Sequence, residues 1–169
     1  MLDENRIKEA KQNVAQYLQD GLLQKKTPQK ETVNILVKNA TDSIIEAKNV
    51  KTPLWKIVIS YYAMFYIANA VLINLGYKVG DKIAHKVTSD ALIVHITGKL
   101  ASELVEQYEL AQDEALAGIR ANELVESFDL ERRKRSIFQY TTSEIAIEAK
   151  AKTSVKRAQE FVIEMMKLL

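Results

Sequence analysis

A run of 21 residues without a charge, from Ile57 to Tyr77, constrains the fold of this sequence most. A helix of that length would cross a bilayer. The run also carries more polar side chains than a single lipid-facing helix usually has, and the sequence has no second such run to pair with them. These side chains are Ser60, Tyr61, Tyr62, Tyr66, Asn69 and Asn74. We therefore predict the central helix of a bundle, surrounded by other helices, and no membrane span.

Composition supports a single helical domain over residues 1–169. A chain of 169 residues is long enough to bury a core, and its five Gly and two Pro leave little turn chemistry for a many-stranded sheet. The sequence has no Cys, which fits a reducing compartment, and its polar start predicts no secretory signal, so a cytoplasmic protein is expected. The net charge of +2 restricts any nucleic-acid site to a local patch.

Apolar periodicity and capping residues predict an all-α, up-and-down bundle of five to seven helices. Two helices are expected within residues 4–49, the first ending near Gly21 and the second starting at Thr27-Pro28. The uncharged helix starts at Thr52-Pro53 and stops at Gly76, and a short link reaches Gly80. Residues 81–126 are expected to form one or two helices, and residues 129–140 are expected to form a helix end and an ordered loop. A capping box of Thr141 and Glu144 opens the last helix.

Candidate catalytic groups are few. The two histidines, His85 and His95, are ten residues apart and do not share the face that a helical zinc pair needs, so no metal site is expected. No glycine-rich phosphate loop is present, and no cofactor is predicted. Most carboxylates lie among lysines at helical spacing, which is typical of a solvated face.

Two segments stand out against this background. The first, Tyr61–Leu72, mixes aromatic and small residues inside the uncharged helix, a pattern that core packing also explains. The second is a run of four cations, Arg132, Arg133, Lys134 and Arg135, followed by Tyr140. It fits a phosphate or RNA site, or a solvated helix end whose cations complement the helix dipole.

The two segments together resemble the HEPN domain, a nucleotide-binding helical family. Tyr61–Leu72 resembles the family's signature of paired aromatics followed by Ala-Met-Phe, and 74–77 its Leu-Gly-Tyr exit. Ala84-His85-Lys86 resembles the opening of the family's next helix. Residues 132–140 resemble its arginine-rich segment, which ends in a pair of the Asp/Glu-Tyr type, and residues 158–162 resemble its last helix. The likeness covers residues 53–169, and residues 4–49 are less characteristic.

The resemblance implies a helical bundle that dimerises through the helices flanking the arginine segment. Many members pair with a small nucleotidyltransferase in toxin and antitoxin systems. Active members are metal-independent endoribonucleases that combine an Arg with a His four to six residues further on. In that arrangement the arginine holds the scissile phosphate and the imidazole moves a proton.

This sequence departs from the active pattern. The position suited to the His holds Tyr140, which follows Arg135 after four intervening residues and Arg133 after six. In an alternative alignment the position of the His is occupied by Phe138. A phenol with a pKa of about 10 is a poor general base at neutral pH. Tyr66 and Asn69 stand where the family often has His and Arg. His85 supplies an imidazole, but from a different helix, where a structural or capping role is the expected one.

The sequence thus predicts a non-catalytic HEPN-like protein that binds a nucleotide, RNA or a nucleotidyltransferase partner. Its expected phosphate-binding residues are Arg132, Arg133, Arg135 and Tyr140, of which Arg135 and Tyr140 are also the catalytic candidates. Its candidate cleft residues are Tyr62, Tyr66, Asn69 and His85. The alternatives are an endoribonuclease toxin and a homodimerising interaction module without a ligand.

Overall fold

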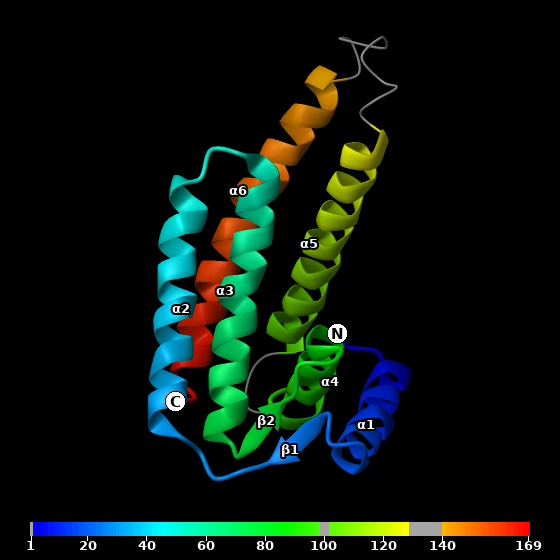
Figure 1. The fold of residues 1–169 in the computed structure, drawn as a ribbon, viewed down its shortest axis with the longest axis vertical. Helices are drawn as coiled ribbons and strands as arrows, with labels where there is room; N and C mark the ends of the chain where they lie inside the picture. The colour runs from blue at the N-terminus through cyan, green and yellow to red at the C-terminus, as the bar shows by residue number, and fades with distance from the viewer. Residues whose placement is uncertain (1, 99–101, 129–139) are drawn as a thin grey trace.

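The computed structural model describes residues 2–98, 102–128 and 140–169, and of 121–128 and 140–146 it describes only the helical backbone. These residues form six helices and two short strands (Figure 1). The helices are α1 (Glu4–Gln19), α2 (Lys30–Asn49), α3 (Pro53–Asn74), α4 (Ala84–His95), α5 (Ser102–Phe128) and α6 (Tyr140–Met166). The strands are β1 (Leu23–Lys25) and β2 (Tyr77–Val79). The all-α class and the expected five to seven helices are confirmed, and the stretch 81–128 contains two helices.

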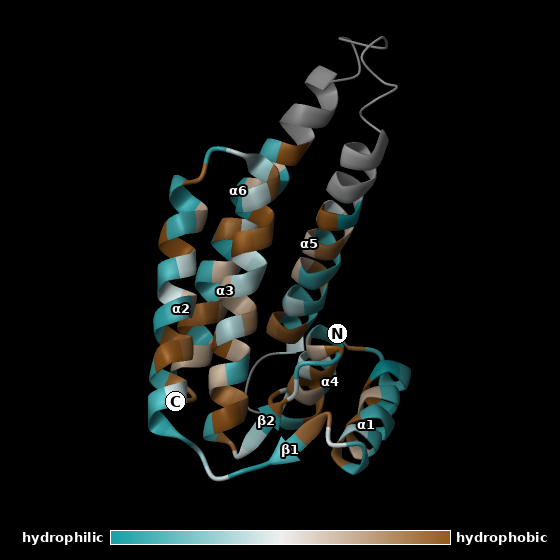
Figure 2. Cartoon of the chain, viewed as in Figure 1, coloured by the Kyte–Doolittle hydropathy of each residue, from teal (hydrophilic) through white to brown (hydrophobic). Residues whose placement is uncertain are grey.

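Helix α3 forms the centre of the bundle, as the uncharged run predicts. It packs against α2, α5 and α6, and Ala63, Ala68 and Ala70 along it have no exposed surface. By length and composition α3 is the one helix in the described part of the chain that would suffice to cross a membrane, and 67% of its most apolar stretch is buried inside the protein. Hydrophobic and hydrophilic residues alternate along α1 and α2, which border solvent (Figure 2).

Both predicted ends of α3 are confirmed. The helix begins with Pro53 as its first residue after Thr52, although the Thr52 side chain makes no capping hydrogen bond. It ends at Asn74, with Leu75 as its C-cap, and Gly76 follows with a φ of 88°. A side chain at Gly76 would also meet the carbonyl oxygen of Lys26, 3.3 Å from the position of its Cβ. Glycine is therefore required there by conformation and by space.

A two-stranded sheet connects the ends of α1 and α3, which the sequence did not predict. β1 pairs antiparallel with β2, with Leu23 opposite Val79 and Lys25 opposite Tyr77. The segment expected to be a plain link, 76–80, thus contains a strand. Each strand has three residues, too few for periodicity to distinguish them from a turn.

Two helix starts differ from the prediction. α2 begins at Lys30 rather than at Thr27-Pro28, because the chain leaves β1 in extended form, with Lys26 N donating to Gly76 O at 2.9 Å. α6 begins at Tyr140, so Thr141 lies inside its first turn and not ahead of it as a cap.

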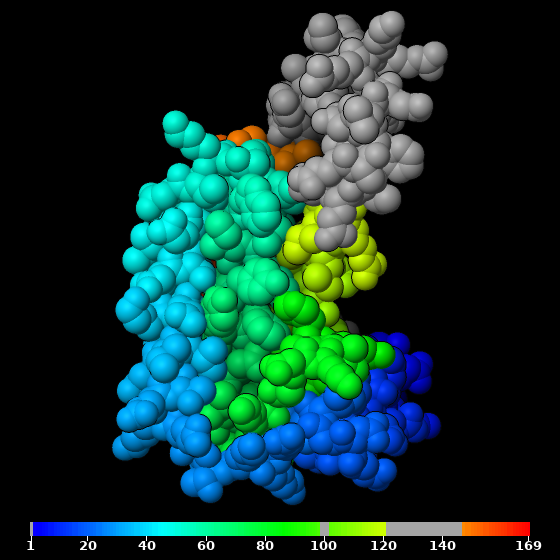
Figure 3. All heavy atoms as spheres, in the orientation of Figure 1, coloured from blue at the N-terminus to red at the C-terminus, as the bar shows by residue number. Residues whose placement is uncertain are grey.

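Helices α1 and α4 pack on each other beside the main bundle. α1 contacts α4 and β1, and Figure 3 shows α4 lying between α3 and α1 on the face drawn. A small second core joins them through Val14, Tyr17, Leu23, Leu72, Val87 and Ala91. Val87 in the first turn of α4 is thereby packed together with Leu72 of α3, and the candidate site lies at this junction.

Candidate functional site

A cluster of rings occupies the junction of α3 with the first turn of α4. We call Tyr61, Tyr62, Phe65 and His85 the ring cluster. The His85 ring centroid lies 4.7 Å from that of Phe65, 5.4 Å from that of Tyr61 and 5.8 Å from that of Tyr62. Tyr61 is buried, while Tyr62, Phe65 and His85 are half-buried, so the cluster joins the core to the surface.

Hydrogen bonds connect His85 to the core of the bundle. The Tyr61 hydroxyl lies 2.7 Å from Nδ1 of His85 and 3.3 Å from the hydroxyl of Tyr108 on α5. Within the described residues Nε2 of His85 has no hydrogen-bond partner. The imidazole is therefore fixed at one nitrogen and free at the other.

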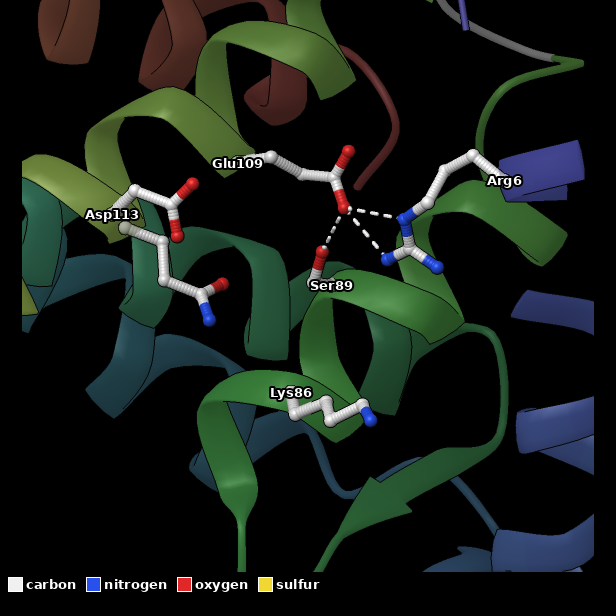
Figure 4. A pocket seen from close by; sticks show the side chains of 6 residues that line it. Arg6, Lys86, Ser89, Glu109 and Asp113 are labelled. Carbon is white, nitrogen blue, oxygen red and sulfur yellow. Dashed lines mark hydrogen bonds and ion pairs between the residues drawn. The ribbon is translucent and has the colours of Figure 1, made fainter. Parts of the chain in front are cut away.

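A polar hollow of about 340 Å³ lies between α1, α4 and α5. Its lining residues are Arg6, Lys86, Ser89, Glu109, Gln112 and Asp113. Figure 4 shows Glu109 receiving hydrogen bonds from Arg6 and Ser89. The Glu109 Oε1 accepts from Arg6 Nε at 3.0 Å, from Arg6 Nη2 at 2.6 Å and from Ser89 Oγ at 2.9 Å.

The opposite side of Arg6 is bound to a buried carboxylate. Arg6 Nη1 lies 2.7 Å from Oδ1 of Asp90, whose side chain has no exposed surface. The other Asp90 oxygen accepts from Tyr17 at 2.9 Å and from Asn13 at 3.0 Å. This network fastens α1 to α4 and α5. No local sequence pattern connects Arg6 with Asp90 or Glu109, so this network could not be predicted from the sequence.

Burial sets the protonation of the site. Burial lowers the pKa of His85, so its imidazole is neutral at pH 7. Burial is also the main cause that raises the pKa of Tyr61 and of Tyr108, and both phenols stay protonated. For Arg6 burial acts against the charge, but the hydrogen bonds to Glu109 and Asp90 prevail and raise its pKa.

Two of the four predicted cleft residues belong to the ring cluster. Tyr62 and His85 lie together, and the His85 ring bonds to Tyr61 and does not cap α4, whose N-cap is Ile83. Tyr66 lines a separate groove between α2 and α3. Asn69 is buried and donates to Phe65 O at 2.9 Å and to Thr88 Oγ1 at 3.3 Å, so it connects α3 with α4 and does not line the hollow.

The predicted phosphate-binding residues Arg132, Arg133 and Arg135 lie outside the described residues. Tyr140 is the first residue of α6, and its side chain also lies outside them. In the part of the chain that is described, no three His, Asp or Glu side chains are grouped so as to hold a metal ion. Two further residues that line the hollow, Lys86 and Asp113, have no hydrogen bond or ion pair in that part.

Comparison of the chain with protein-family models, with curated proteins and with solved structures found no match. The resemblance to the HEPN family therefore stays a prediction from the sequence.

Proposed function

We propose that this chain is a HEPN-like helical protein that binds a nucleotide or RNA without cleaving it. The observation that carries the proposal is the half-buried ring cluster at the junction of α3 and α4. Tyr62, Phe65 and His85 offer aromatic faces, and the exposed ammonium of Lys86 follows directly in the chain. Proteins bind single-stranded nucleic acids by stacking aromatic rings on the bases and by placing cations against the phosphates.

The arginine segment supports the same function from the sequence. Four consecutive cations between α5 and α6, Arg132 to Arg135, supply charge for the phosphate backbone. In this proposal the ring cluster stacks on the bases and the arginine segment binds the phosphates.

Binding without cleavage is supported by the sequence, in which the position suited to the catalytic His holds Tyr140. An endoribonuclease of this type needs an arginine free to hold the scissile phosphate and an imidazole within hydrogen-bond reach of the same group. Arg6, the arginine at the hollow, is bound to two carboxylates. The His85 imidazole contacts the Tyr61 hydroxyl in the ring cluster and is not among the residues that line the hollow.

The test is binding of a fluorescent single-stranded RNA to the purified protein in the presence of a chelator. Stacking on an aromatic side chain contributes about 1–3 kcal/mol per base, so Tyr62→Leu with Phe65→Leu should weaken binding by about tenfold or more. Replacing Arg132, Arg133 and Arg135 by Ala should reduce the salt dependence, by about 0.7 in the logarithmic slope per lost phosphate contact. Trp55→Leu is the matched control, since Trp55 is an exposed aromatic at the start of α3, outside the ring cluster.

A gel of the same RNA after incubation supplies the second readout. Intact RNA with the binding behaviour above supports the proposal. Cleavage that disappears in Arg135→Ala would replace it by the endoribonuclease alternative. No binding to RNA or mononucleotides at low salt would overturn it in favour of a partner-binding module.

A further inference from the structure

The hydroxyls of Tyr108 and Tyr61 and the imidazole of His85 form a chain of hydrogen bonds that runs from the core to the surface. Tyr108 has no exposed surface and Tyr61 is 1% exposed, so neither hydroxyl has bulk water as a partner. In the described part of the chain Tyr108 has Tyr61 as its one hydrogen-bond partner, at 3.3 Å. The other partner of the Tyr61 hydroxyl is Nδ1 of His85, at 2.7 Å.

A single direction of this chain gives each buried phenolic hydrogen an acceptor. In that direction Tyr108 donates to the Tyr61 oxygen, and Tyr61 donates to Nδ1 of His85. If Nδ1 donated instead, one of the two phenolic hydrogens would have no acceptor, and an unsatisfied buried donor is costly. The distance of 2.7 Å also fits a hydroxyl donor, because hydrogen bonds from N–H groups are usually about 2.9–3.0 Å long.

The hydrogen of the His85 ring is therefore carried by Nε2. A neutral imidazole has one N–H, and partial burial lowers the pKa of His85, which keeps the ring neutral at pH 7. Nε2 has no partner among the described residues and is not one of their buried unpartnered atoms, so it reaches the surface. It does so in the ring cluster, where the His85 centroid lies 5.8 Å from that of Tyr62 and 4.7 Å from that of Phe65.

We infer that His85 is a fixed hydrogen-bond donor whose Nε2–H binds an acceptor oxygen of the nucleotide or RNA held at the ring cluster. The inference rests on the proposed function. Oxygens of the base, the ribose and the phosphate share the lone pairs that such a donor needs. The same tautomer does not take up the proton of a 2′-hydroxyl, because Nδ1 is occupied by Tyr61 and Nε2 already carries its hydrogen. At His85 it thus gives a physical reason for binding without cleavage.

Nitrogen-15 NMR of the free protein at pH 7 tests which ring nitrogen carries the hydrogen. Protonated and unprotonated ring nitrogens differ in chemical shift, and the signals that disappear in His85→Gln are those of His85. We expect a protonated Nε2 and an unprotonated Nδ1. Tyr61→Phe should mix the two tautomers, and Tyr66→Phe should not, since the Tyr66 hydroxyl makes no hydrogen bond to a described residue. A hydrogen on Nδ1 in the unaltered protein would overturn the inference and leave the proposed function standing.

Titration of the labelled protein with single-stranded RNA tests the contact itself. Binding should shift the Nε2–H signal of His85. His85→Phe keeps an aromatic ring and loses the donor, so it should weaken RNA binding by about three- to tenfold, the scale of one neutral hydrogen bond. Tyr66→Phe is the control and should bind RNA as the unaltered protein does. Circular dichroism confirms that both variants are folded.

Separate titrations with uridine and with inorganic phosphate identify the acceptor. A shift of the Nε2–H signal with uridine assigns it to the base or the ribose, and a shift with phosphate assigns it to the phosphate group. RNA that binds while the Nε2–H signal stays unchanged would overturn the inference alone. No binding of RNA or mononucleotides at low salt would overturn the inference together with the proposed function.

Discussion

The hydroxyl of Tyr61 lies 2.7 Å from Nδ1 of His85 and so joins the middle of α3 to the first turn of α4. Tyr61 also contacts Tyr108 of α5, so a single phenol connects three helices at the candidate site. The position of the imidazole in the ring cluster depends on this contact.

Tyr61→Phe should destabilise the protein by about 1–2 kcal/mol, because it leaves the buried Tyr108 hydroxyl and His85 Nδ1 without their partner. Urea unfolding followed by circular dichroism measures the change. Tyr66→Phe is the control, since the Tyr66 hydroxyl makes no hydrogen bond to a described residue. Equal stability of the two variants would contradict a role for the Tyr61 contact.

The stability of the protein should fall with acid through His85. Partial burial lowers the pKa of the His85 imidazole in the folded state, and the unfolded chain has its ordinary value of about 6.5. Between these two values the unfolded state binds more protons than the folded state, so the free energy of unfolding decreases as pH falls below about 6.5. His85→Gln should lose this part of the pH dependence, measured as the difference between the unfolding curves of both proteins from pH 7.5 to pH 5. Identical pH profiles would show that His85 is not responsible.

Arg6→Met should destabilise the protein by about 3 kcal/mol or more, because it leaves the buried carboxylate of Asp90 without its counter-charge. Lys38→Met is the matched control. Its ion pair with Asp42 is exposed on α2, and loss of such a pair costs about 0–1 kcal/mol. Chemical denaturation of both variants compares them directly. A cost for Arg6→Met no larger than that for Lys38→Met would contradict the buried network.

Gly76→Ala should destabilise the protein by about 1–2 kcal/mol, since the residue has a φ of 88° and its Cβ would lie 3.3 Å from the Lys26 carbonyl. Gly98→Ala is the control, because no atom lies within 4 Å of the position of its Cβ and its φ is not in the left-handed region. Thermal and urea unfolding of the two variants give the comparison. A neutral or stabilising effect of Gly76→Ala would show that the end of α3 relaxes without cost.

The ends of α3 could be predicted because their signals are local. Proline fixes the backbone angle of the first residue, and glycine accepts the left-handed angle after the last one, so Pro53 and Gly76 act within a few residues of their positions. The start of α2 could not be predicted in this way. Thr27-Pro28 has the same local signal as Thr52-Pro53, but pairing of β1 with β2 keeps the chain extended to Gln29.

In the candidate site, too, the sequence predicted the residues with local signals and not those brought together by tertiary contacts. The sequence indicated Tyr62 and His85, whose aromatic surroundings lie partly within one helix. It gave no indication of Arg6, Asp90, Glu109 or Asp113, which look like ordinary surface charges in a helical pattern.

The sequence by itself determined the helical class, the central position of α3 and the chemical types present, because periodicity, capping residues and a long uncharged run act over short distances along the chain. Tertiary structure alone decided the sheet between β1 and β2, the ion-pair network of Arg6 and the polar hollow. Arg6 and Glu109 are 103 residues apart, and Tyr17 and Asp90 are 73 residues apart. Such pairs form only when burial of the apolar faces brings their helices together, since in the unfolded chain water solvates each charge separately.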